Sequence, residues 1–83
     1  MGADLSGTDL RGVTLRGSVA IAADLRGALL QGCDLLGVDL RDADLCGADL
    51  RGAIYVTQMQ VNAARGDAAT VLPEGFERPS HWS

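Results

Sequence analysis

Large apolar residues recur at every fifth position between residues 3 and 57. The recurring centres are Leu5, Leu10, Leu15, Leu25, Leu30, Leu35, Leu40, Leu45 and Leu50. Ala20 interrupts this series and Tyr55 ends it. A small residue stands two positions before each centre, Asp usually one before, Arg often one after and Gly usually two after. The unit at residues 48–52, which reads ADLRG, contains the whole frame.

This interval excludes both a straight α-helix and a flat strand. A helix turns by about 100° per residue, so side chains five positions apart would spiral around it instead of forming one apolar face. A strand alternates its faces, so an odd step would send successive leucines to opposite sides. The pattern predicts short extended stretches separated by bends, a closed coil in which each Leu points to the axis and Gly occupies the corner.

The frame also resembles a known family. The segments 3–5, 23–25, 43–45 and 48–50 all read ADL, and the surrounding units are similar to the A-(D/N)-L-x-x repeats of pentapeptide-repeat proteins. The resemblance covers about two thirds of the chain. It implies an all-β fold, a right-handed quadrilateral parallel β-helix with four units per coil and under three coils. The residues alone predict a coil and leave three or four sides open.

With four units per coil, residues twenty apart stack on one another. The predicted core then consists of the nine repeat leucines together with Tyr55, in columns such as Leu5-Leu25-Leu45. Ala20 stands where its column would have a large residue, and we expect its neighbours Val19 and Ile21 to lie outside.

Three segments are expected: the β-helix at residues 3–57, a capping helix at 58–65 and an extended tail at 66–83. Thr57 and Gln60 fit a capping box, and Gly66 is expected to stop the helix. Two prolines keep the tail from forming a regular helix. The tail looks like one that recurs after such repeats in bacterial proteins. We expect its aromatic residues Phe76 and Trp82 to anchor it on the β-helix.

Several outward positions carry apolar residues instead of Asp or Arg. They are Val19, Ile21, Leu29, Leu36, Ile54 and Val56. A contiguous apolar surface on a soluble protein indicates that something covers it. Two occupants are open, the chain's own tail or another protein.

The N-terminal end of the predicted coil has no capping segment, since the repeat begins at Ala3. The first coil would present a bare edge of backbone donors and acceptors, which natural sheets usually protect. This end is therefore a docking surface, a self-association surface or the cut end of a longer protein.

The chain is acidic, with a net charge of −4. The most discussed activity of the resembled family is inhibition or protection of a type II DNA topoisomerase by imitating DNA. B-DNA carries one charge per about 1.7 Å of axis, whereas under three coils span only about 13 Å. The Asp residues here also alternate with Arg. Asp side chains that bond to the turn backbone and pair weakly with Arg explain the composition more simply.

No constellation of residues indicates catalysis, a cofactor or a metal. The single His81 has no Cys or His cluster beside it, and Cys33 and Cys46 are expected on different sides, with Cys33 in the core and the Cys46 thiol exposed. We predict a non-catalytic structural module of the bacterial cytoplasm that binds a protein partner. Direct nucleic-acid binding and membrane association are not expected. The alternative is a small DNA-mimicking topoisomerase (gyrase) inhibitor or protection protein.

Overall fold

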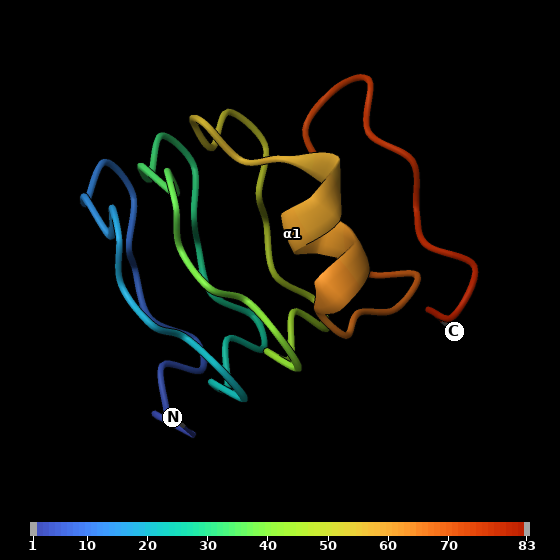
Figure 1. The fold of residues 1–83 in the computed structure, drawn as a ribbon, viewed down its shortest axis with the longest axis horizontal. Helices are drawn as coiled ribbons and strands as arrows, with labels where there is room; N and C mark the ends of the chain where they lie inside the picture. The colour runs from blue at the N-terminus through green and yellow to red at the C-terminus, as the bar shows by residue number, and fades with distance from the viewer. Residues whose placement is uncertain (1, 83) are drawn as a thin grey trace.

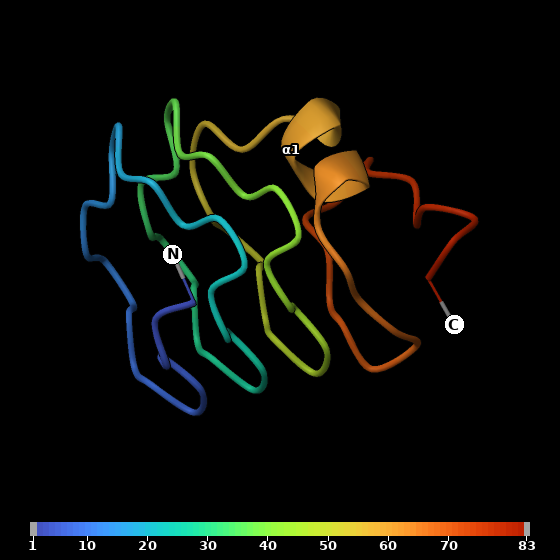
Figure 2. The same cartoon turned by 60° about the horizontal axis from the view of Figure 1, so that its bottom comes forward.

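The computed structural model describes residues 2–82, which wind into a stack of four-sided coils (Figures 1 and 2). Parallel backbone bridges join residues twenty positions apart, for example Asp4 with Asp24 and Asp24 with Asp44. Each coil therefore contains four units. We number the sides first to fourth after the units centred on residues 5, 10, 15 and 20. The bridges are isolated pairs because each unit is extended for only a few residues before it bends.

A β-turn closes each unit of the coil. In the first unit the Leu5 carbonyl accepts a hydrogen bond from the N–H of Thr8 at 3.2 Å, and Gly7 has a φ of 64°. A turn with positive φ at its third residue suits Gly, which has no Cβ to obstruct that conformation. On the fourth side the same place is taken by Ala22 and Asp42, with φ values of 58° and 59°. These two turns adopt a backbone that is unfavourable for an L-residue by about 1–2 kcal/mol.

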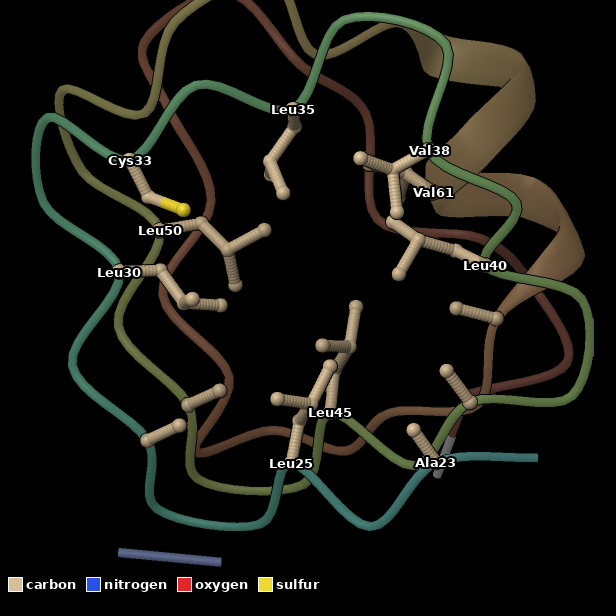
Figure 3. Close-up of a cluster of buried hydrophobic side chains, with 14 of the residues drawn as sticks. Ala23, Leu25, Leu30, Cys33, Leu35, Val38, Leu40, Leu45, Leu50 and Val61 are labelled. Carbon is tan, nitrogen blue, oxygen red and sulfur yellow. The ribbon is translucent and has the colours of Figure 1, made fainter. Parts of the chain in front are cut away.

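The repeat leucines share one interior, as the periodicity predicts. Leu25, Leu30, Leu35 and Leu40 point from the four sides toward a common axis (Figure 3) and are at most 3% exposed. Burial of one such side chain stabilises the fold by about 1.5–3 kcal/mol before entropy is subtracted. The corresponding residues of the first coil are only partly buried, because no other described coil stacks on their outer side. They are Leu5, Leu10, Leu15 and Ala20.

The predicted core position of Tyr55 is wrong. Its side chain is 60% exposed and its φ is 60°, so the residue turns outward where the chain leaves the repeat. A lumen lined by leucines would leave the phenolic hydroxyl without a hydrogen-bond partner, which is costly. Val56, predicted to face outward, packs partly buried against the core.

Helix α1 spans Gln58–Ala63 and takes the fourth side of the third coil. The predicted capping box is confirmed, since Thr57 Oγ1 accepts from the Gln60 N–H and Gln60 Oε1 accepts from the Thr57 N–H. The Gln60 amide also donates to the carbonyls of Leu35 and Val38, at 2.8 and 2.9 Å. One glutamine thus both starts the helix and satisfies carbonyls at the edge of the second coil.

The helix ends earlier than predicted, and Gly66 does not stop it. Ala63 is its last residue and Ala64 is its C-cap. Val61 and Ala64 are buried, at 0% and 1% exposure. The chain then returns to the coil, where Arg65 forms a parallel bridge with Asp44 on the first side.

A second bridge shows that the predicted tail begins too early. Val71 pairs with Asp49 on the second side. Thr70 takes the small inward position with 1% exposure, and its hydroxyl donates to the Leu45 carbonyl at 2.8 Å. Leu72 packs against the core in the place of a repeat leucine. Residues 64–72 therefore form two sides of a further, partial coil, and only residues 73–82 are a tail.

The tail crosses the C-terminal end of the tube, and Trp82 covers Gly66. A Cβ at Gly66 would lie 2.6–2.8 Å from three atoms of the indole ring. The indole N–H donates to the Ala64 carbonyl at 3.0 Å, and the guanidinium of Arg78 lies 5.9 Å from the ring centroid. Arg78 also donates to the Thr70 carbonyl at 2.8 Å. Trp82 thus occupies the end of the first-side column, above a residue that has no side chain.

Candidate protein-binding surface

The third side of the β-helix carries an exposed apolar patch made of Leu36, Ile54 and Tyr55. Their exposed fractions are 43%, 45% and 60%. The residues lie in neighbouring coils, because the Leu35 N–H donates to the Ile54 carbonyl at 2.9 Å and Asp34 bridges to Ile54. We call these three residues the third-side patch.

A charged residue borders the third-side patch. Arg16, on the same side of the first coil, forms a 2.8 Å ion pair with Asp34, and its guanidinium carbon lies 5.6 Å from the centroid of the Tyr55 ring. The pKa of Asp34 is lowered by the hydrogen bond from the Leu36 N–H and then by Arg16. An apolar centre with a polar rim is the usual organisation of a protein-binding surface.

The other predicted surface residues do not join this patch. Val19 is 63% exposed on the fourth side, where it bridges to Asp39. Ile21 and Leu29 are half-buried, and Val56 packs against the core. Tyr55 was missed because the five-residue interval places it inward. The useful signal was that the repeat ends directly after Tyr55. At the end of the repeat the backbone is no longer constrained to point the centre residue into the core.

Phe76 and Trp82 anchor the tail, at the C-terminal end of the tube and not on its side. Trp82 is 7% exposed and bonds to Ala64, and Phe76 is partly buried against the core cluster. These contacts lie at the C-terminal end of the tube, and Leu36 and Ile54 remain exposed on its side. Of the two occupants left open by the sequence, the tail is therefore not the one that covers the third-side patch.

The acidic residues along the sides serve the turns. In the first-side unit of the second coil the Arg26 N–H donates to Asp24 at 3.1 Å and the Arg26 guanidinium pairs with the same carboxylate at 2.7 Å. The side-chain bond from Arg26 lowers the pKa of Asp24 to about 2. The same arrangement recurs in the pairs Asp9-Arg11, Asp39-Arg41 and Asp49-Arg51. Each of these carboxylates is neutralised by a neighbouring Arg, as the simpler account of the composition expects.

Neighbouring groups restrain the two thiols and the single imidazole among the described residues. Cys33 and Cys46 are free thiols; Cys33 is buried as predicted, and Cys46 is half-buried instead of fully exposed. The hydrogen bond to Asp44 raises the pKa of Cys46 to about 11, and burial raises that of Cys33. His81 lies with Nε2 3.1 Å from the Ala64 carbonyl oxygen. Neither thiol is a ready nucleophile at neutral pH.

Two further searches of residues 2–82 bear on the kind of site. No group of three or more His, Cys, Asp or Glu side chains in this range is arranged to hold a metal ion. In the same range, no helix combines the length and apolar character needed to cross a membrane.

Comparison with known protein families identifies the repeat. The family model for Pentapeptide repeats matches residues 1–17 and 23–54, with eight copies of the repeat. The chain belongs to the pentapeptide-repeat family. The unmatched residues 18–22 are the irregular unit around Ala20.

Two particular relatives can be named. The uncharacterized protein YybG of Bacillus subtilis (strain 168) is 58% identical over 30 residues, which are 36% of this chain and 11% of that protein. The crystal structure of alr5209, a pentapeptide repeat protein from Nostoc Pcc 7120, is 34% identical and is matched over 93% of this chain and 75% of its own, with a TM-score of 0.40.

Proposed function

We propose that this chain is a non-catalytic binding module of the bacterial cytoplasm, a rigid β-helix that presents the third-side patch to a protein partner. The observation that carries the proposal is the exposure of Leu36, Ile54 and Tyr55 in a chain whose own tail packs elsewhere. Aromatic and aliphatic side chains at the centre of a polar rim contribute most of the binding energy at protein interfaces.

The scaffold suits this role because its sides are held rigidly. Leu36 and Ile54 lie in segments that the neighbouring coils fix by backbone hydrogen bonds, Gly17 N–H to Leu36 O at 2.8 Å and Leu35 N–H to Ile54 O at 2.9 Å. A preorganised surface loses little conformational entropy on binding. The patch is small, so we expect a transient partner and an affinity in the micromolar range.

The partner is expected to offer an apolar centre. The paired carboxylate of Asp34 and the guanidinium of Arg16 leave little net charge beside the patch. DNA mimicry requires a continuous run of uncompensated negative charge. The Asp-Arg pairs along the sides weigh against that alternative, and they favour a partner whose binding survives high salt.

Site-specific photo-crosslinking in bacterial cells tests this proposal. A photoreactive amino acid replaces Tyr55 in the patch, or Met59 as the control, since Met59 is 82% exposed on α1. We expect a discrete crosslinked partner from position 55 and not from position 59, and its loss when Leu36→Asp is added. The partner should remain bound in high salt after purification.

Three outcomes would contradict the proposal. They are equal crosslinking from both positions, a crosslink that Leu36→Asp leaves intact, and recovery of a gyrase subunit that dissociates in high salt. The last result would favour DNA mimicry instead. The fold of each variant is checked by circular dichroism and by the emission of Trp82.

A further inference from the structure

The backbone of the first coil has an edge that no described residue pairs with. In the second coil the N–H groups of Leu29, Asp34 and Asp39 donate to carbonyls of the first coil at 3.0 Å. The corresponding donors of the first coil are the N–H groups of Asp4, Asp9, Thr14 and Val19, and none of them has a partner within residues 2–82. We call this surface the N-terminal edge. Exposed edges of this kind pair readily with another extended chain.

Accessible apolar side chains lie inside the N-terminal edge, and we call them the mouth of the tube. Leu5, Leu10 and Leu15 are only partly buried, whereas the leucines stacked beneath them are at most 2% exposed. Val13 occupies an inward position, yet its side chain is 40% exposed because the first coil is the outermost one described. The edge therefore combines unpaired backbone groups with accessible apolar surface.

The opposite end of the tube is closed. Gln60 satisfies the carbonyls of Leu35 and Val38, Thr70 donates to the Leu45 carbonyl, and Trp82 covers Gly66. A head-to-tail stack of copies would have to displace these contacts. Head-to-head pairing requires no such change, and it produces a closed two-fold dimer in which the same surface of each copy is buried.

The charge of the first coil also favours a second copy. Residues 2–22 contain two Asp and two Arg and are neutral, although the whole chain carries a net charge of −4. Two copies can therefore approach edge to edge without repulsion between their rims. The N-terminal edge has the outline of a four-sided coil, and the first coil of a second copy has the same outline.

We infer that the N-terminal edge binds a second copy of this chain, head to head, with extended segments of the two first coils pairing in antiparallel directions. The Cα extents of the whole chain across its two shorter axes are 25 and 21 Å, which limits each end face to at most roughly 500 Å². Two such faces bury at most about 1,000 Å², which is the low end for a specific interface. The dimer should accordingly be weak, with a dissociation constant in the micromolar range.

Two measurements on the 83-residue chain test this inference. Sedimentation equilibrium from about 1 µM to about 1 mM should show the mass rising from 8.6 kDa toward twice that value. Hydrogen exchange followed by NMR should show slower exchange of the Asp9 and Thr14 amides at the higher concentration. A monomer throughout, or amide rates independent of concentration, would overturn the inference.

Variants locate the interface. Val13→Lys places a positive charge at the mouth of both copies and should weaken dimerisation at least tenfold, while Met59→Lys on α1 should not change it. Should Val13→Lys fail to fold, Thr8→Lys, also at the edge, replaces it. A dimer unaffected by these changes would contradict the inference. Leu36→Asp should leave the dimer intact, so the result is independent of the third-side patch.

Discussion

The packing of Trp82 over Gly66 makes a prediction that a single methyl group can test. Gly66→Ala would place a Cβ 2.6–2.8 Å from three indole atoms, closer than real contacts allow. The ring must then shift and lose its 3.0 Å bond to the Ala64 carbonyl. Overpacking of this kind destabilises by about 1–3 kcal/mol.

Removal of the Trp82 ring gives the largest loss of stability expected at this contact. Trp82 is 7% exposed, so Trp82→Ala should reduce the free energy of unfolding by about 3–5 kcal/mol. The total for a domain of this size is about 4–12 kcal/mol. The packing of this ring therefore accounts for about a quarter or more of the stability. Tyr55→Ala is the matched control, because that ring is 60% exposed and its loss should matter by under about 1 kcal/mol.

Urea denaturation measured by circular dichroism provides the unfolding free energies. Because Trp82 is the only tryptophan, its emission in native Gly66→Ala reports the displacement directly, and we expect a shift to longer wavelength. The reasoning is refuted if Gly66→Ala leaves both stability and emission unchanged, or if Tyr55→Ala is as destabilising as Trp82→Ala.

Two further predictions concern the turns. Ala22→Gly should stabilise the protein by about 0.5–1 kcal/mol and raise Tm by roughly 2–8 °C, because Ala22 has a φ of 58° and an exposed side chain. Ala63→Gly in α1 should lower Tm instead. Two changes of the same sign would contradict the account. Lowering the pH from about 4 to about 2 should destabilise the fold. The native pKa values of Asp9 and Asp24 are about 2, below the ordinary 3.8. The contribution of these two carboxylates to the free energy of unfolding is therefore fully present above pH 3.8 and is lost as the pH falls through 2. Asp24→Asn should make the acid loss smaller in urea titrations at each pH, and an unchanged pH profile would contradict the role given to this carboxylate.

The repeat could be interpreted from the sequence because each five-residue unit determines its own conformation. Each unit specifies one bend and one buried side chain through a small residue, an outward Asp, an inward Leu and a corner Gly. The coils repeat this arrangement along the stack. The capping box at Thr57 and Gln60 was equally local and is confirmed. Where a rule depends on neighbouring residues alone, the sequence analysis and the structure agree.

The errors occurred where the period changes. Leu72 is 22 positions after Leu50 instead of 20, so the return of the chain to the second side was hidden. The segment that contains α1 adds one residue before Arg65, and the following unit adds another before Val71. The sequence Thr70-Val71-Leu72 retains the small-outward-large order and could have indicated it. The position of Trp82 follows from no period at all, since it depends on a gap above Gly66 that only the folded chain creates.

The third-side patch was predictable in part. Leu36 and Ile54 stand at outward positions of the repeat, and both are exposed as expected. Tyr55 was not predictable from the interval, because its side chain turns outward only through the positive φ with which the chain leaves the coil. Whether the tail would cover the patch could not be decided without the contacts of Trp82.

The central claim is that leucines five positions apart share one narrow interior, and two adjacent leucines test it. Leu35 is 2% exposed and its neighbour Leu36 is 43% exposed. Urea denaturation should show that Leu35→Ala lowers the free energy of unfolding by about 2–5 kcal/mol, and that Leu36→Ala lowers it by no more than about 0.5 kcal/mol. Equal losses for the two variants, or a larger loss for Leu36→Ala, would contradict the four-sided coil.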